Sequence, residues 1–379
     1  MTYSYAKLGD IATYINGYAF KPKDHGTKGL PIIRIQDLTG SSNDRGYYAG
    51  EYPSKIEINN GDVLISWSAS LGVYVWNKGK ALLNQHIFKV KFDKKDIDKD
   101  YFVYAVRFNL TKLKQLTHGA TMKHVVKKDF ENVLIPYPSL KRQREIAYVL
   151  DKLERNLTQK SQELDKLDEL IKARFVEMFG DPINNSKNWK LINIKKCCVD
   201  ILGGGTPSKS HPEFFTGSVP WVTPKDMKEN VITDSKDHIT YEAISNSSAK
   251  LIPSNSVLMV IRSGILKHTL PVAINKNEVT INQDMKAFVP TSEISPIFLE
   301  NYFIAISPDI LSKVRSVTAD NINFKSFQKR KIILPPISLQ NEFANFVQQV
   351  DKSKFENIVY LNKTLSMKIL GQLGDVFRD

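Results

Sequence analysis

Residues 146–179 read IAYVLDKLERNLTQKSQELDKLDELIKARFVEMF, and an apolar pattern runs through the whole stretch. Apolar side chains recur every seven residues, at Leu150, Leu157, Leu164 and Ile171. Others fill the offset positions between them, namely Ile146, Leu153 and Leu167. This spacing predicts one long helix with a single apolar seam, roughly 50 Å long at 1.5 Å per residue.

Two basic residues interrupt the seam of this helix. Lys160 and Arg174 stand where the pattern requires apolar residues, and near the end the seam shifts onto Phe175 and Phe179. We expect cross-helix pairing or a partner contact at the two basic positions. Two interpretations of the helix stay open from this segment alone: a spacer between domains, or a helix that packs on its own domain.

Length and composition predict a cytoplasmic protein of two or three domains. No apolar run approaches the roughly 20 residues needed to cross a bilayer, so no membrane is expected. The amino terminus, MTYSYAKLGD, lacks the basic and apolar regions of a signal peptide.

Cys197 and Cys198 are adjacent, which suits neither a loop-closing disulfide nor a four-ligand metal site, so reduced packing residues are expected. The histidines show no metal-ligand spacing, and no metal is predicted.

The net charge of +13 is distributed unevenly along the chain. Residues 1–140 carry 20 Lys and Arg against 13 Asp and Glu, and residues 182–335 carry 19 against 13. Residues 141–181 and 336–379 are neutral, with 9 against 9 and 5 against 5. Two basic bodies joined by neutral helices are expected when two domains face a polyanion such as double-stranded DNA. A basic balance alone is a weak indication, since many cytosolic proteins are basic without binding nucleic acid.

The first 138 residues alternate short β-type runs with turns, which predicts a mixed α/β domain. The clearest runs are residues 31–35, 63–67 and 86–90. One helix is predicted over Tyr101 to Leu116. Pro136 and Pro138 close the domain, because a proline disfavours helix at the residue before it, and the long helix is expected to begin after Ser139.

The second half of the chain repeats the first. Gly180-Asp181-Pro182 ends the long helix, and a polar connector runs to Asn188. Colinear matches follow: Lys7 with Lys190, Pro31 with Pro220, Asp37 with Asp226, Ile58 with Ile252, Asn84-Gln85 with Asn282-Gln283, and Gln143 with Gln340. The series indicates a duplicated unit, a globular body followed by a helix, with a period far too long for a solenoid.

A second long helix with an apolar stripe is predicted over Phe343 to Val376, although Lys354, Asn357 and Lys368 interrupt a strict heptad. Two long helices with partial seams can satisfy each other as an antiparallel pair. The predicted fold is therefore mixed α/β with an internal pseudo-twofold repeat. Its parts are α/β domains at residues 1–138 and 182–336, and helical regions at residues 139–181 and 337–379 that pack as an antiparallel coiled-coil spacer.

Several motifs, spread over essentially the whole chain, resemble the specificity (S) subunits of type I restriction-modification systems. They are GYAFK at residues 17–21, GGTPS at 204–208, VPWVTPKDM at 219–227, the Pro-to-Gln junctions at 137–143 and 335–340, and KARFVEMFG at 172–180. The ordered set is specific, whereas GYAF alone would be weak. The first junction has one residue more between proline and glutamine than the second, which weakens that correspondence.

The resemblance implies two target recognition domains, each reading one half of a split DNA sequence, joined by helices that fix the gap between the halves. It implies two modification (M) subunits that methylate an adenine in each half-site, and restriction (R) subunits that add ATP-dependent translocation and cleavage. It places S-adenosylmethionine on the M subunits, ATP and Mg on the R subunits, and no cofactor on this chain. Because the two bodies differ at most positions, the half-sites are expected to differ.

Two other functions are weighed against this one. A free-standing DNA-binding regulator with the same fold stays open. An ATP-using enzyme is disfavoured: residues 203–210, GGGTPSKS, approach the phosphate-binding pattern G-x-x-x-x-G-K-[ST], but Ser208 replaces its last glycine and Pro207 removes an amide donor. The loop is either a glycine-rich turn or a place where backbone approaches a DNA phosphate. The chain has no Asn-Pro-Pro-Tyr-type stretch, so methyl transfer needs a partner and no catalytic residue is expected.

Candidate DNA contacts are Arg, Lys, Asn, Gln, Ser and Thr side chains on loops, since these match base edges in the major groove. In the first domain they are Lys21, Lys23, Arg34, Gln36, Ser66, Ser68, Asn84, Gln85, Thr121 and Lys123. In the second they are Thr206, Ser208, Lys209, Lys225, Arg262, Ser263, Asn282, Gln283, Asn321 and Lys325.

The repeat divides these candidates into shared and divergent residues. The Asn-Gln pairs occur in both domains, so they are better explained as a shared structural turn or a phosphate contact. Arg34 and Arg262 stand where the other domain has different residues, as a sequence reader requires. Trp67, Trp76 and Trp221 are expected in the core.

Overall fold

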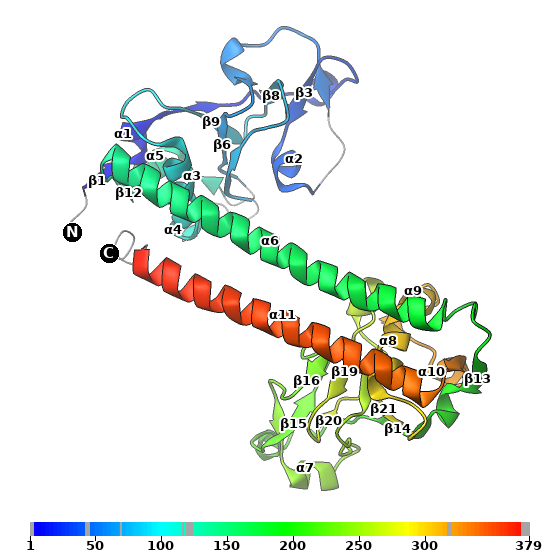
Figure 1. The fold of residues 1–379 in the computed structure, drawn as a ribbon. Helices are drawn as coiled ribbons and strands as arrows, with labels where there is room; N and C mark the ends of the chain where they lie inside the picture. The colour runs from blue at the N-terminus through cyan, green and yellow to red at the C-terminus, as the bar shows by residue number, and fades with distance from the viewer. Residues whose placement is uncertain are drawn as a thin grey trace. The chain divides into compact units, whose positions relative to one another are not determined.

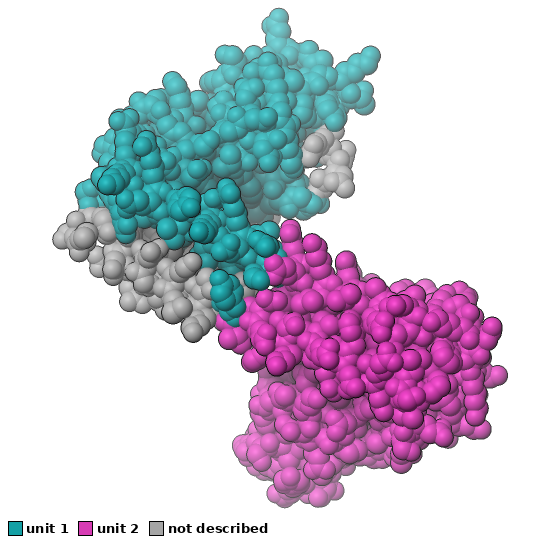
Figure 2. All heavy atoms as spheres, in the orientation of Figure 1, with its two compact units in different colours: residues 1–160, 360–379 teal, residues 161–359 magenta. Residues whose placement is uncertain are grey.

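The computed structural model describes residues 4–41, 46–68, 70–115, 117–118, 124–316 and 320–372, and the chain divides into two compact units (Figures 1 and 2). Unit 1 contains residues 1–160 and 360–379, and unit 2 contains residues 161–359. Helix α6 (Leu140–Phe179) therefore contributes its first part to unit 1 and its last part to unit 2. Helix α11 (Ile337–Gln372) is divided between the units at residue 359.

Unit 1 is built on two four-stranded sheets. The antiparallel sheet has the order β2 (Thr13–Asn16), β9 (Ile87–Lys91), β6 (Val63–Ser66), β7 (Gly72–Val75). The mixed sheet has the order β4 (Tyr47–Tyr48), β3 (Leu30–Ile33), β8 (Ala81–Leu83), β5 (Glu57–Ile58). A short ladder joins β1 (Tyr5–Lys7) to β12 (Leu134–Pro136) and so closes the unit before α6 begins. Its core contains Tyr14, Phe88 and Phe130, whose rings contact one another.

Unit 2 also has two sheets, and both are mixed. The larger one has the order β14 (Cys198–Gly203), β21 (Met285–Pro290), β18 (Val257–Val260), β19 (Val272–Asn275), β16 (Val231–Ile232). The smaller one has the order β17 (His238–Ile239), β15 (Val219–Val222), β20 (Thr280–Ile281). The closing ladder joins β13 (Lys190–Asn193) to β24 (Lys331–Leu334). Cys197 and Cys198 are buried in this unit as free thiols, as expected of packing residues.

The buried glutamines Gln143 and Gln340 make equivalent bonds, which confirms the internal repeat. Gln143 Oε1 accepts a bond from the backbone N–H of Asp98 (2.8 Å), the residue that caps α3 (Lys99–Phe108). Gln340 Oε1 accepts from the N–H of Ser295 (2.9 Å), which precedes α8 (Pro296–Ala305). Each amide nitrogen donates to the carbonyl of a proline five residues earlier. Each long helix is thus anchored to its own α/β body, because a buried amide needs all its partners.

Two glycines of the predicted motifs also hold equivalent places. A Cβ atom on Gly17 would lie 2.0 Å from the carbonyl oxygen of Asn84, and one on Gly204 would lie 2.1 Å from that of Asn282. Backbone approaches at this distance exclude any side chain. The Asn turn and the glycine loop are therefore packed together in both units.

Within unit 2, the end of α6 packs antiparallel on the start of α11 (Figure 1). The rings of Phe175 and Phe343 are 5.5 Å apart. Arg174 Nη2 lies 3.2 Å from a carboxylate oxygen of Glu342, so this interruption of the seam is a cross-helix ion pair. Farther back on α6, Asp168 pairs with Lys354 at 2.6 Å. The earlier residue on α6, Asp168, pairs with the later residue on α11, Lys354, and Arg174 pairs with Glu342. This reversed order confirms the predicted antiparallel packing for this unit.

The prediction of one helix over Tyr101 to Leu116 is wrong. The chain forms α3 and a second helix, α4 (Leu110–Gln115), while Leu116 lies outside the described residues. Asn109 separates the two helices: it is buried, and its Nδ2 donates to the carbonyl of Ala105 (2.9 Å). That bond satisfies a carbonyl at the end of α3 and lets the chain turn.

Other element boundaries shift by a few residues. Ile35, predicted in a strand, begins α2 (Ile35–Thr39) because the Asp37 carboxylate accepts from the N–H of Arg34 (2.9 Å) and caps the turn. The second long helix begins at Ile337, directly after two prolines, rather than at Phe343; Val376 lies outside the described residues. The long central helix begins at Leu140, as predicted. Among the helices described, none has the length and apolar character of a membrane span.

Candidate nucleic-acid interface

The loops that follow β6 and β18 lie at equivalent places and gather many of the predicted contact residues. Each loop is bridged through backbone to a short strand, Ser68 to His124 in unit 1 and Arg262 to Asn321 in unit 2. The carbonyls of the preceding residues, Trp67 and Ile261, accept bonds from Val125 and Ile322 at 2.9 and 2.8 Å. The same framework therefore presents a different loop sequence in each unit.

In unit 2, Arg262, Asp284 and Asn282 form one connected group. Arg262 Nε donates to Asp284 Oδ1 at 2.6 Å, and Asn282 Nδ2 donates to Asp284 Oδ2 at 3.1 Å. The N–H of Asp284 donates back to Asn282 Oδ1 at 3.1 Å. Asn282 is buried and its backbone N–H donates to Val222 O, so it forms a structural turn beneath the loop. Arg262 is the outermost member, with its side chain 49% exposed.

The glycine-rich loop lies beside this group. The Thr206 hydroxyl donates to the side-chain oxygen of Gln283, next to Asn282. The N–H of Gly205 donates to Ile281 O (3.0 Å), and the indole of the buried Trp221 donates to Gly205 O (3.0 Å). These bonds fix the base of the loop and leave Ser208 and Lys209 exposed at its tip.

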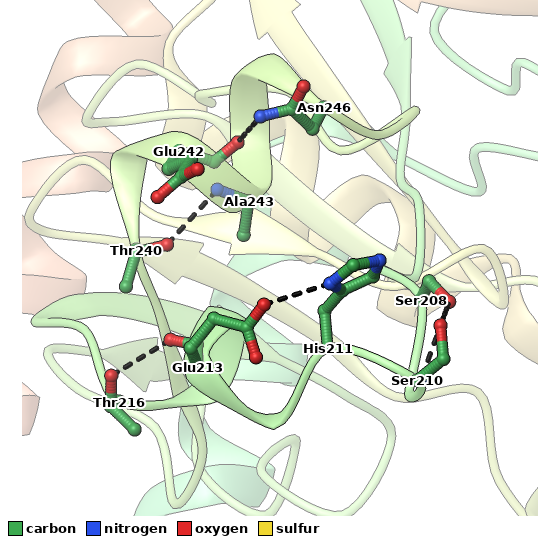
Figure 3. A network of polar contacts seen from close by, with 9 residues as sticks. All are labelled: Ser208, Ser210, His211, Glu213, Thr216, Thr240, Glu242, Ala243 and Asn246. Carbon is green, nitrogen blue, oxygen red and sulfur yellow. Dashed lines mark hydrogen bonds and ion pairs between the residues drawn. The ribbon is translucent and has the colours of Figure 1, made fainter.

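A polar network continues from the tip of that loop (Figure 3). The hydroxyls of Ser208 and Ser210 are 2.7 Å apart, and His211 Nδ1 lies 2.8 Å from Glu213 Oε1. A bond from its own backbone N–H, together with His211, lowers the pKa of Glu213 below its usual value. The His211 ring also stacks on Phe214, which is buried. These contacts hold the residues on both sides of Lys209, and Lys209 itself takes no part in them.

In unit 1, the equivalent loop is aromatic. The Trp67 ring centroid lies 5.3 Å from that of His86 and 6.4 Å from that of His124, and the indole stacks on Phe88. Ser66 and Ser68 are each only 1% exposed, and the Ser66 hydroxyl donates to Ser70 O. Trp67 is half-buried against the core, while Trp76 is fully buried, as expected.

The Asn84-Gln85 turn of unit 1 matches that of unit 2. The N–H of Asn84 donates to Ile33 O (3.1 Å), as that of Asn282 does to Val222 O. Gln85 is exposed, and its amide lies 3.3 Å from His86 Nε2. The turn thus has a structural role in both units and carries an exposed glutamine.

The remaining unit 1 candidates flank the mixed sheet rather than the Trp67 loop. Lys21 and Lys23 are exposed around the turn Pro22–Asp24, where the N–H of Lys21 donates to Asp24 (2.7 Å). Arg34 directly precedes α2, with Nε 3.7 Å from Asp37, and Gln36 is exposed on that helix. Thr121 and Lys123 lie outside the described residues.

The remaining unit 2 candidates occupy three places. Lys225 is exposed in the turn after β15, where Asp226 accepts bonds from Thr223. Lys325 is exposed on α10 (Phe324–Phe327). The Ser263 hydroxyl accepts from the N–H of Ile265 at 3.4 Å and so caps a short turn beside Arg262.

Sequence reasoning missed Asp284, whose carboxylate holds the exposed Arg262. A signal was present, since Asp284 directly follows the repeated Asn-Gln pair and stands where unit 1 has His86. Reading the repeat one residue further would have found it.

The comparisons with known proteins agree on one family. The sequence profile described as "Type I restriction modification DNA specificity domain" matches residues 2–169 and 186–366. The EcoR124I/EcoR124II specificity subunit of Escherichia coli is 34% identical over 224 residues, which are 57% of this chain and 53% of that protein. The EcoBI specificity subunit of Escherichia coli is 21% identical over 384 residues, covering 90% of this chain and 78% of that protein. The chain thus spans about half the length of the first of these relatives.

Two solved structures share the fold. The S subunit of a type I restriction-modification system from M. genitalium has a TM-score of 0.59 at 13% identity, covering 97% of this chain and 94% of that one. A structure from a study of assembly and conformational transition of the type I R-M system has a TM-score of 0.53 at 18% identity, covering 96% and 97%. Because the family profile matches both halves and most of the sequence, the chain belongs to the type I restriction-modification DNA specificity family.

Proposed function

We propose that this chain is the DNA-specificity subunit of a type I restriction-modification complex and that it recognises a bipartite, asymmetric sequence. One observation carries the proposal: on the same framework, two equivalent loops differ in chemistry, with a buried Ser68 and the aromatic pair Trp67 and His86 in one unit, and an exposed Arg262 paired with Asp284 in the other. Side chains that differ on equivalent loops read different base edges, so each unit reads its own half-site.

Residues 1–138 and 182–336 are the proposed target recognition domains. The neutral regions 139–181 and 337–379 are the proposed spacer and docking regions. Both proposed recognition domains carry excess positive charge, which supplies affinity for phosphates, while base contacts supply specificity. One helical turn of duplex is about 34–36 Å, so helix α6, about 60 Å long at 1.5 Å per residue, is long enough to separate two half-sites by more than a turn.

The proposed partners are double-stranded DNA, two M subunits that methylate adenine, and R subunits that translocate and cleave. The chain itself is proposed to be non-catalytic and cytoplasmic. S-adenosylmethionine belongs to the M subunits, and ATP and Mg belong to the R subunits. The names of the relatives support this assignment, and they do not favour a free-standing regulator.

The test is a footprint of the purified full-length chain with its cognate M subunit on a duplex library, followed by mapping of the methylated adenines. We expect two protected blocks of different sequence, separated by an unread gap of constant length, with one adenine methylated in each. Protection of a single contiguous sequence would contradict the two-domain assignment.

A further inference from the structure

We propose that Arg262 reads a guanine in the half-site of unit 2, and that Asp284 is the positioning residue that orients its guanidinium. The inference rests on the proposed DNA-recognition function and deepens it by naming a base and a second residue. Asp284 itself touches no base in this proposal; it acts through Arg262.

The side chain of Arg262 is held at a single point. Nε donates to Asp284 Oδ1 at 2.6 Å, and the other carboxylate oxygen is occupied by Asn282 Nδ2 at 3.1 Å. Because Asn282 is 7% exposed and its side-chain Oδ1 accepts from the N–H of Asp284, the carboxylate cannot rotate without breaking partly buried bonds. A charge-assisted bond from an oriented carboxylate limits the rotamers of the arginine before any ligand arrives.

The backbone beneath Arg262 is fixed by the same residue. The carbonyl of Asp284 accepts from the N–H groups of Ile261 and Arg262, at 2.8 and 3.2 Å. On the other side, the N–H of Ser263 donates to Asp320 O at 3.0 Å. Asp284 therefore bonds to both the backbone and the Nε of Arg262, so one turn fixes the side chain at two points.

The free end of Arg262 has the chemistry of a guanine reader. With Nε engaged, the two Nη groups carry the remaining donors, and within the described part of the chain they have no hydrogen-bond partner. Guanine presents two acceptors, O6 and N7, on its major-groove edge, and arginine meets them with two parallel N–H groups.

A phosphate contact fits the same residues less well. The adjacent Asp284 carboxylate cancels much of the arginine charge, and it repels a phosphate placed nearby. Phosphate affinity depends on net positive charge, whereas base reading depends on the direction of the donors. An oriented arginine in a neutral pair is therefore better suited to a base.

Unit 1 has no such pair at this position. Ser68 and His86 stand where unit 2 has Arg262 and Asp284, and Ser68 is buried. The inferred guanine therefore belongs to one half-site only.

The experiment is a selection from random duplexes with the full-length chain bound to its cognate M subunit. The variants are Arg262→Gln, Asp284→Asn and Arg262→Lys. The matched control is Arg330→Gln, which breaks another arginine–aspartate pair in unit 2, Arg330 with Asp309 at 2.5 Å. Preference at every base position and overall affinity are measured for each.

The wild-type complex is expected to select an invariant guanine in one half-site. Arg262→Gln should reduce the preference at that position about 10-fold and leave the others unchanged. Asp284→Asn should weaken the same position by about 3- to 5-fold, and it should add little when combined with Arg262→Gln. Arg262→Lys should keep the overall affinity and weaken the guanine preference by about 3-fold, since an ammonium can donate to O6 and N7 but lacks the planar fork that fixes both bonds. Arg330→Gln should change no position.

Each contrary result has its own meaning. A wild-type complex that selects no bipartite sequence overturns the proposed function. A bipartite sequence whose base preferences all survive Arg262→Gln overturns the guanine assignment alone. An Asp284→Asn profile that equals wild type, or that weakens all positions equally, overturns the positioning role. If Arg262→Gln does not fold, the milder Arg262→Lys decides the assignment.

Discussion

The Trp67 loop of unit 1 and the Arg262 loop of unit 2 occupy the same place in the repeated fold, yet they differ in chemistry. Trp67 lies against two histidine rings and its neighbour Ser68 is buried, whereas Arg262 is half-exposed and paired with a carboxylate. The supports around both loops are alike, since Asn84 and Asn282 form the same turn. The difference teaches that the fold keeps these anchors constant while the loops that they support differ.

The anchors give the largest expected effect. Gln340→Leu should lower the free energy of unfolding by roughly 3 kcal/mol, because Ser295 N and two carbonyls lose their buried partner. Gln143→Leu should cost a similar amount in unit 1. Denaturant unfolding of both variants measures this, with the exposed Gln348→Leu as a control that should change stability by less than about 0.5 kcal/mol. A large inequality between the two anchors would break the equivalence of the units.

The next effect depends on pH and distinguishes the units again. Glu300 is buried in α8 of unit 2, where α3 of unit 1 has Val103. Burial raises the pKa of Glu300 from 4.5 to about 8; Asp351 acts in the same direction, and Lys354 and Lys276 act against it. The folded state therefore holds a proton that the unfolded state releases. This stabilisation is complete below about pH 4.5 and is lost as the pH rises through about 8.

Glu300→Gln keeps the neutral shape of the acid at every pH. The variant should therefore be more stable than wild type above pH 8, by roughly 2 to 4 kcal/mol, and equal to it near pH 4.5. Thermal unfolding between pH 4 and pH 9 checks this, with the exposed Glu356→Gln as the control. Equal pH profiles for wild type and Glu300→Gln would show that the carboxyl is not protonated in the folded protein.

The smallest expected effect separates phosphate contacts from base contacts. Lys209 is exposed at the tip of the glycine-rich loop. Under the proposed function, Lys209→Ala should weaken DNA binding about 3-fold for all sequences and reduce the slope of log K against log salt by about 1. Titrations at several salt concentrations measure both, and the exposed Lys352→Ala on α11 is the control. A change in base preference would instead make Lys209 a reader.

The sequence was sufficient to predict the repeat, because its supports require particular residue types. A backbone contact requires glycine at Gly17 and Gly204, and a buried junction requires an amide at Gln143 and Gln340. Because these contacts accept one residue type, the same glycine and glutamine occur at equivalent positions of both halves. The long helices and their antiparallel pairing in unit 2 followed from the period of the apolar residues.

What the sequence could not predict depends on burial and on which polar groups meet in the folded chain. Asn109 ends α3 through a buried bond, although its neighbours continue a helical pattern. Ser66 and Ser68 have the residue type of a DNA contact, but both are buried. Asp284 lies 22 residues from Arg262, and only the packing of two loops brings them together. Residue type alone does not indicate burial or pairing across loops.

The buried junctions also bear on how such genes recombine. Within the described part of the chain, the side chain of Gln143 bonds to Asp98 and Pro138 of unit 1, and that of Gln340 bonds to Ser295, Glu293 and Pro335 of unit 2. A crossover after the codon for either glutamine transfers a domain together with its complete anchor. A crossover between Asp98 and Pro138 would instead rely on the incoming sequence to rebuild it. Recombinant genes of this family should therefore have their crossover points in the codons of the long helices, after the glutamines.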